Sequence, residues 1–166
     1  MARDLKENKV INSRSTGILI PLSAMRSSQD WGCGDLGSLK SWLSFIGKQG
    51  IKVLQILPIN ETDPSENCPY SALSTYAIDP IYLSITDIEE YKNCQKAKAI
   101  VEEIKEDIKL WRQSSTTKFK QIKAAKYRVL WETYLYFLQE EKLKNTARYQ
   151  NFLNFEKRNF SWIVPY

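Results

Sequence analysis

Two short apolar runs, each stopped by a proline, most constrain what this chain can fold into. Residues 16–20 end at Pro21, and residues 53–57 end at Pro58. Both runs are too continuously apolar for a half-exposed antiparallel sheet, so they predict parallel strands that are buried on both faces. Between them, residues 36–46 carry apolar side chains at helical spacing. The pattern therefore predicts a strand, helix, strand unit with a right-handed crossover.

Both ends of the helix in this unit carry recognisable signals. Asp35 is a predicted N-cap, Lys48 suits the last turn, and Gly50 is expected just past the end. Two parallel strands by themselves leave unpaired edges and uncovered apolar faces. The first half of the chain therefore predicts the opening part of a larger α/β sheet.

Helical patterns take over from about residue 86. Thr86 and Glu89 form a capping-box pattern, which predicts that a helix begins here. After a break at residues 114–117, we expect a long helix over residues 118–142 and a shorter helix over residues 146–158. The predicted organisation is a flexible arm (1–13), a strand–helix–strand portion with a site loop (14–85) and a helical subdomain (86–166).

The long helix carries an aromatic-rich stripe between its charged faces. At helical spacing such a stripe is more often core than a stacking surface for nucleic acid, and we predict that it is core. Its members are Phe119, Ile122, Tyr127, Leu130, Trp131, Tyr134, Phe137 and Leu138.

Composition excludes several classes of function. The chain has no histidine, so catalysis and metal binding by histidine are excluded, and its three cysteines are too far apart for a CxxC motif. A net charge of +5 is a mild excess, which favours solvated helix faces over nucleic-acid binding. Residues 1–13 lack the apolar core of a signal peptide, and no apolar run is long enough for a membrane span. We expect a cytoplasmic protein that does not bind membranes.

The loop after the second strand holds the candidate binding residues. It places Tyr70, Ser74 and Asp79 just past the carboxyl end of a strand, which is where α/β folds build their sites. A sugar has apolar C–H faces and a rim of hydroxyls, and aromatic, hydroxyl and carboxylate groups suit it. Tyr76 and Tyr82 lie in the same segment, and we interpret them as packing residues.

Two other possible sites are weaker. Gly32, Gly34 and Gly37 match the spacing of a dinucleotide loop, but they lie about ten residues after the strand and lack the expected acidic partner. The acidic residues before residue 86 form no convincing pair of acid and nucleophile for glycoside chemistry. Those candidates are Asp30, Asp35, Glu61, Asp63, Glu66 and Asp79.

Four motifs from Arg14 onward resemble the amylomaltase family of 4-α-glucanotransferases in their order. They are Arg14-Ser15-Thr16-Gly17-Ile18-Leu19-Ile20-Pro21-Leu22, Trp31-Gly32-Cys33-Gly34-Asp35-Leu36-Gly37, Leu54-Gln55-Ile56-Leu57-Pro58, and the segment from Cys68-Pro69-Tyr70 to Asp79-Pro80. Each motif is weak alone, and together they are specific. Against the family pattern, Cys68 replaces a usual Ser, Asp79 a usual Asn and Leu54 a usual Trp.

The resemblance implies a (β/α)8 TIM barrel with a largely helical inserted subdomain. It implies transfer of α-1,4-glucan segments to glucose or maltooligosaccharide acceptors through a covalent glycosyl-enzyme, without a metal or organic cofactor. It implies that Tyr70 stacks near the reaction centre and that Ser74 and Asp79 shape or support the sugar site. The family's nucleophile Asp and acid/base Glu come from later strands, so the resemblance implies no catalytic residue in this chain. A barrel of this kind takes about 250 residues, and the chain would need the remaining C-terminal barrel.

Two alternatives stay open from the sequence. A non-catalytic α-glucan-binding module would use the same Tyr70 site but needs a self-sufficient fold. A nucleotide-binding strand–helix–strand domain would instead use the glycines from Gly32 to Gly37.

Overall fold

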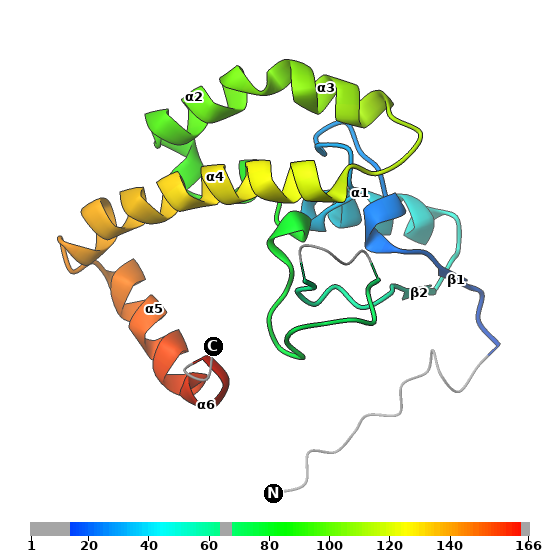
Figure 1. Cartoon of the computed structure of the whole chain (residues 1–166). Helices are drawn as coiled ribbons and strands as arrows, with labels where there is room; N and C mark the ends of the chain where they lie inside the picture. The colour runs from blue at the N-terminus through cyan, green and yellow to red at the C-terminus, as the bar shows by residue number, and fades with distance from the viewer. Residues whose placement is uncertain (1–13, 64–67, 164–166) are drawn as a thin grey trace, which may run out of the picture.

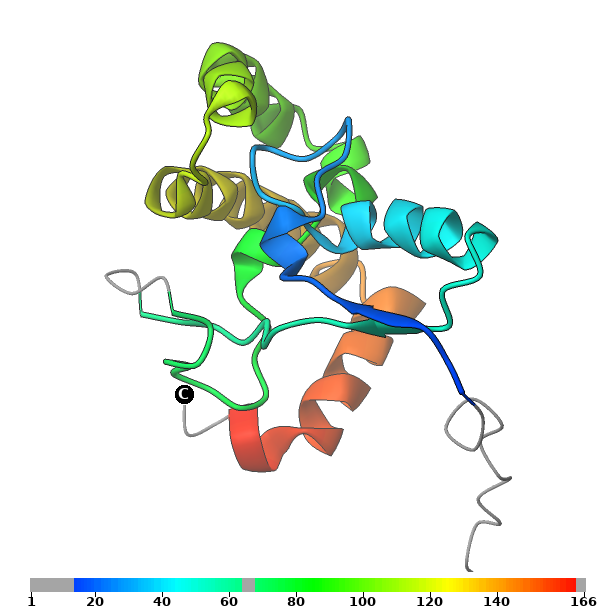
Figure 2. The same cartoon turned by 90° about the vertical axis from the view of Figure 1, so that its right-hand side faces the viewer.

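A parallel pair of strands with a helix between them opens the fold, as the sequence predicts. The structure, a computed structural model, describes residues 14–63 and 68–163. Strand β1 (Gly17–Leu19) pairs in parallel with β2 (Val53–Gln55), with Gly17 opposite Val53. Figure 2 shows the two strands side by side, with α1 (Leu36–Lys48) above them.

Local signals set the ends of α1. The Asp35 carboxylate accepts a hydrogen bond from the Ser38 backbone N–H at 2.9 Å, which confirms the predicted N-cap. Gly50 has a φ of +77° just past the helix, a backbone conformation that favours glycine. Ile46 is buried on the apolar side of α1, whereas Leu43 and Phe45 remain exposed.

The strands are less covered than the sequence predicts. Leu19 is 58% exposed and Val53 is 42% exposed, although both were expected to be buried. Among the described residues the sheet contains these two strands alone, so nothing pairs with its outer edges or packs over both of its faces. Two strands alone therefore leave apolar side chains uncovered, as expected. The prediction that both strands are buried on both faces is wrong for the described residues.

Five further α-helices account for most of the remaining described structure. After α1 they are α2 (Gln95–Glu103), α3 (Lys105–Gln113), α4 (Phe119–Phe137), α5 (Ala147–Arg158) and α6 (Phe160–Ile163). In Figure 1, α2 and α3 lie over α4, and α5 turns away from the end of α4. Within the described ranges no helix is both long enough and apolar enough to cross a membrane.

The helix expected from Thr86 begins later, at Gln95. Thr86 instead lies in a short 3-10 helix, Ile85–Asp87, and a second one covers Glu90–Lys92. These tighter turns place Ile85 in the core at 3% exposure, so tertiary packing overrides the capping-box pattern. The helix also divides into α2 and α3 at the buried Ile104.

The two later helices follow the prediction closely. A π-helical turn, Leu138–Lys142, extends α4 to the end expected for the long helix. Thr146 caps α5 by accepting a hydrogen bond from the Tyr149 N–H at 3.2 Å.

One apolar core joins the two halves of the chain. It draws residues from the loop before α1, from the turns at residues 80–88 and from helices α2 and α4. Its buried members are Trp31, Cys33, Ile81, Ile85, Cys94, Ala97, Ile104, Ile122, Ala125 and Val129.

The predicted stripe of α4 lies only partly in this core: Ile122 is buried, and Phe119 and Leu130 pack against the core. Tyr127, Trp131 and Tyr134 are 43%, 59% and 47% exposed. The buried residues of α4 are Ile122, which belongs to the stripe, and four that do not: Ala125, Lys126, Val129 and Thr133. The packing of α2 against α4 therefore covers one side of the predicted stripe and leaves the side with Tyr127, Trp131 and Tyr134 exposed.

Candidate functional site

A cavity of about 460 Å³ lies just past the carboxyl ends of the two strands. The chain that leaves β1 contributes Pro21 and Leu22, and the chain that leaves β2 contributes Leu57 and Pro58. One face of α4 forms the opposite wall, with Phe119, Lys120, Lys123, Ala124 and Tyr127. The cavity therefore lies at the carboxyl ends of the parallel strands, where α/β folds commonly form their binding sites, and its lining is largely apolar with a few charged groups.

The described parts of the loop after β2, residues 59–63 and 68–80, are held in shape by their own polar groups. Two isolated antiparallel bridges, Asn60 to Ile78 and Thr62 to Ala72, join its two arms. The Ser74 hydroxyl accepts hydrogen bonds from the backbone N–H groups of residues 76 and 77, both at 3.1 Å. Asp79 accepts a hydrogen bond from the Ile81 N–H at 2.9 Å and so caps the 3-10 helix Pro80–Tyr82.

A charged cluster lies on one wall of the cavity. The Lys123 ammonium group donates to the Asp79 carboxylate at 2.8 Å and to the Thr62 carbonyl at 3.0 Å. It also lies 3.9 Å from a carboxylate oxygen of Glu61, which accepts a hydrogen bond from the Tyr127 hydroxyl at 2.6 Å. Partial burial, followed by this hydrogen bond, raises the pKa of Tyr127 above its ordinary value. A tyrosine phenol is protonated at neutral pH, and Tyr127 is here a hydrogen-bond donor to Glu61.

A buried lysine holds the site against the core. Lys126, which is 1% exposed, donates hydrogen bonds to the Ile81 and Leu83 carbonyls, each at 2.6 Å. Its ammonium group lies 3.5 Å from the Asp35 carboxylate and 5.9 Å from the centre of the Trp31 ring. Burial lowers the pKa of Lys126, and Asp35 opposes that shift. The contacts connect α4 to the cap of α1 and to the turn after Asp79.

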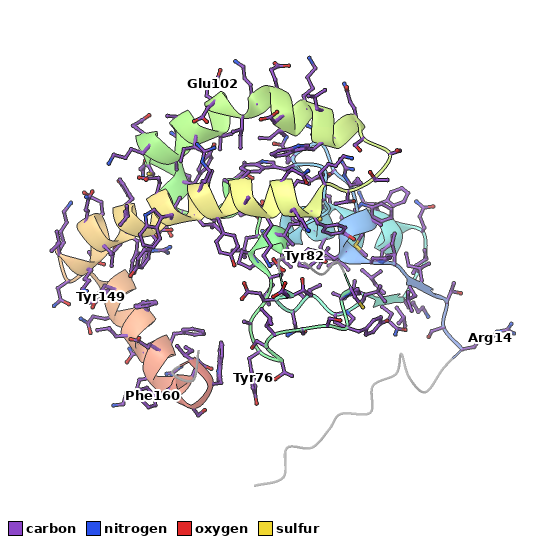
Figure 3. All side chains as sticks on the ribbon, in the orientation of Figure 1. Arg14, Tyr76, Tyr82, Glu102, Tyr149 and Phe160 are labelled. Carbon is purple, nitrogen blue, oxygen red and sulfur yellow. The ribbon has the colours of Figure 1, made fainter. Side chains whose placement is uncertain are left out.

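Of the three predicted site residues, Asp79 lines the cavity. Ser74 is 3% exposed and its hydroxyl supports the loop, while Tyr70 is 71% exposed and lies outside the set of cavity-lining residues, although its neighbour Pro69 belongs to it. Both remaining tyrosines make packing contacts. Tyr82 packs against the core, where burial raises its pKa to about 12, and the ring of Tyr76 stacks on Trp162 at 5.4 Å. Figure 3 shows Tyr82 in the interior below α4 and Tyr76 at the outer edge of the loop.

Sequence reasoning missed Lys123 and did not recognise the position of Tyr127. Lys123 was one of many lysines on a helix, and Tyr127 was assigned to the core stripe. Their spacing of four residues places them on the same face of α4 as Phe119, which was the available signal. Glu61 was considered only as one member of a possible pair of carboxylates. The residues that it contacts, Lys123 and Tyr127 on α4, are more than 60 residues away in sequence, so no local pattern indicates them.

The glycine loop has no room for a phosphate. A Cβ on Gly34 would lie 2.2 Å from the Leu22 carbonyl oxygen, and one on Gly32 would lie 2.8 Å from the Trp111 carbonyl oxygen. The glycines thus allow close backbone packing, and the loop is buried beside the core. This finding disfavours the nucleotide-binding alternative. Among the described residues, no three Asp, Glu, Cys or His side chains are grouped so that they could hold a metal ion.

Comparison with known proteins shows which family the chain belongs to. The family model described as 4-alpha-glucanotransferase matches residues 20–166. The chain belongs to this family. It is 29% identical over 150 residues to the 4-alpha-glucanotransferase of Chlamydia caviae, an alignment that covers 90% of this chain and 27% of that relative.

Two further 4-alpha-glucanotransferases give similar matches. The chain is 27% identical over 160 residues to 4-alpha-glucanotransferase DPE2 of Oryza sativa, covering 92% of this chain and 16% of that protein. It is 28% identical over 151 residues to the enzyme of Haemophilus influenzae, covering 88% and 22%. The chain therefore spans between 16% and 27% of the length of these relatives.

Proposed function

We propose that this chain forms the N-terminal, glucan-binding part of an amylomaltase-type 4-α-glucanotransferase. The complete enzyme would transfer α-1,4-glucan segments to glucose or maltooligosaccharide acceptors in the cytoplasm, without a cofactor. The carrying observation is the cavity past the carboxyl ends of the parallel strands, lined by a charged cluster from the loop and from α4. In this proposal residues 14–85 open a (β/α)8 barrel, residues 86–166 form an inserted helical subdomain, and residues 1–13 are an arm.

The cavity groups suit a sugar ligand. Apolar side chains such as Leu22, Leu57 and Phe119 can cover the C–H faces of a glucose ring. Asp79, Lys123 and Tyr127 supply acceptors and donors for its hydroxyls. We assign Tyr70 to an outer stacking position and Ser74 to support of the loop.

The chemical step would need groups beyond these. Retaining glycoside transfer requires a carboxylate nucleophile and a carboxylic acid about 5 Å apart. In our proposal both come from later strands of the barrel, which the 166 residues do not include. We therefore expect the chain alone to bind glucan and not to transfer it.

Two assays on the purified chain test this function. Titration calorimetry with maltotriose should detect binding, and Asp79→Ala should weaken it, because that substitution removes the acceptor that faces the cavity. Absence of any binding would overturn the glucan-binding role. Incubation with maltotriose should release no glucose, and glucose release by the chain alone would show that it contains a complete catalytic set.

A self-contained glucan-binding module is the second candidate. The observation in its favour is the single core that joins both halves of the chain, because such a core can support independent folding. A cooperative thermal transition together with maltodextrin binding would favour the module. A broad, non-cooperative transition would favour a part that folds only within a larger barrel.

A further inference from the structure

Two lysines on α4 hold the turn that follows the cavity loop. Lys123 donates a hydrogen bond from its ammonium group to the Asp79 carboxylate at 2.8 Å. Lys126, which follows three residues later on a neighbouring part of the helix surface, donates to the Ile81 and Leu83 carbonyls, each at 2.6 Å. Asp79 and the two carbonyls belong to one short 3-10 turn and its flanking residues. One lysine therefore holds the carboxylate of this turn, and the other holds its backbone.

The turn orients the Asp79 carboxylate through hydrogen bonds of its own. One carboxylate oxygen of Asp79 accepts from the Ile81 N–H at 2.9 Å, and the other oxygen accepts from Lys123. The Tyr82 N–H in turn donates to the Asp79 carbonyl at 3.0 Å. The direction of the carboxylate therefore depends on where the backbone of the turn lies, and Lys126 contacts that backbone from the side of the core.

Stability alone does not account for a charged side chain at position 126. Lys126 is 1% exposed, and two other residues on the buried side of α4, Ile122 and Val129, are 0% exposed. Burying an ammonium group is costly, and apolar residues can often replace a whole buried ion pair without loss of stability. An apolar side chain of similar length could fill this place but could not donate to the two carbonyls. The lysine therefore adds a defined position of the turn to what packing provides.

We propose that Lys126 is a positioning residue: it holds the turn after Asp79 against α4 and thereby orients the Asp79 carboxylate toward a ligand in the cavity. This inference rests on the proposed function, because it takes Asp79 to bind a hydroxyl group of the glucan. Lys126 is not among the described residues that line the cavity, so it acts on the ligand only through the turn. A purely structural role would instead predict that binding is lost only as the whole fold is lost.

The unmodified chain, Lys126→Met and the control Val129→Ala test this role. Val129 is buried in the same helix and has no hydrogen-bonding side chain, so Val129→Ala should destabilise the fold without releasing the turn. Trimethylamine N-oxide in every sample favours the folded state of a weakened variant. Lys126→Gln, which keeps a donor, takes the place of Lys126→Met if the methionine variant does not fold. The measurements are titration calorimetry with maltotriose and hydrogen exchange at the Ile81 N–H, which contacts the Asp79 carboxylate.

Folded Lys126→Met should bind maltotriose about tenfold more weakly, the loss typical of one hydrogen bond to a charged group. Its Ile81 N–H should also exchange faster relative to the amides in the middle of α4, because the turn opens locally. Val129→Ala should speed exchange at both places alike and keep the affinity of the unmodified chain. Lys126→Gln should change binding and exchange in the same direction as Lys126→Met, but by less.

Two results would overturn the positioning role while the proposed function stands. They are an affinity of folded Lys126→Met within about twofold of the unmodified chain, and equal losses of affinity in Lys126→Met and Val129→Ala. If the unmodified chain binds no maltotriose, the proposed function fails. Exchange at the Ile81 N–H then decides by itself whether Lys126 holds the turn, and unchanged exchange in the variant would refute this.

Discussion

Replacement of Lys126 by methionine tests what determines the contribution of an ion pair to the free energy of unfolding. We expect burial of the pair to matter more than the distance between its charged groups. The methionine keeps most of the apolar stem and removes the ammonium group. The Ile81 and Leu83 carbonyls then lose a donor at 2.6 Å, and the Asp35 carboxylate loses a cation at 3.5 Å. Removing one partner of a buried ion pair costs about 3–5 kcal/mol, and each unsatisfied carbonyl about 1–3 kcal/mol. Because methionine also avoids the burial of a charge, we expect a net loss of about 3–5 kcal/mol.

Lys40→Met is the matched control. Lys40 lies closer to its carboxylate partner Asp87, at 2.7 Å, but the two side chains are 72% and 48% exposed. An exposed pair contributes about 0–1 kcal/mol, so this substitution should have little effect. The contrast separates distance from burial, because the shorter pair is the one expected to matter less.

Urea unfolding followed by tryptophan fluorescence measures both variants. With a slope of about 2 kcal/mol per M, Lys126→Met should lower the midpoint by about 2 M and Lys40→Met by less than about 0.5 M. A loss below about 1 kcal/mol for Lys126→Met, or equal losses for the two variants, would refute the reasoning.

Further substitutions test three other parts of the structure. Burial raises the pKa of the Cys33 thiol from 9.0 to about 12, so the unfolded thiol ionises first and the free energy of unfolding falls as pH rises above 9.0. In urea titrations, the Cys33→Ala variant should lose about 2 kcal/mol less stability than the unmodified chain between neutral pH and pH 10.5. Gly34→Ala should lower the melting temperature sharply, because its Cβ would lie 2.2 Å from a backbone oxygen. Gly47 lies in a helix with open space around it, so Gly47→Ala should raise the free energy of unfolding by up to about 1 kcal/mol. Asp79→Asn should cost about 1–3 kcal/mol in urea titrations, because Lys123 loses the nearer of its two carboxylate partners.

Each of these has its own control. Cys68 is exposed, so Cys68→Ala should leave the pH dependence unchanged. A Gly34→Ala protein as stable as Gly47→Ala would contradict the tight packing of the loop. Asp79→Ala should cost more than Asp79→Asn because it also removes the acceptor that caps Ile81, and the reverse order would argue against the capping role.

Local signals predicted much of the framework. The apolar runs predicted the parallel strands, and Asp35, Thr146 and Gly50 lie at the helix ends where the sequence placed them. The failures came where packing competed with a local pattern. The capping box at Thr86 did not begin a helix, because the tighter turns there place Ile85 in the core.

The candidate site was only partly predictable. Asp79 was identified because it follows a strand, but its partner Lys123 lies 44 residues away and the Glu61–Tyr127 pair is separated by 66 residues. No sequence spacing relates such residues, because the loop and α4 meet only through the fold.

The sequence by itself determined the elements of this protein and most of their ends, because caps, glycine conformations and apolar periodicity act within a few residues. Only the tertiary structure decided which side of α4 is covered. Periodicity predicted Ile122 and Trp131 in one stripe. In the fold, α2 and the turns at residues 80–88 pack against α4 on the side of Ile122, which is buried, whereas Trp131 remains exposed. The same packing buried Lys126 and placed Lys123 at the cavity. A helix specifies the spacing of its side chains, whereas its neighbours determine which of them meet a core, a cavity or solvent.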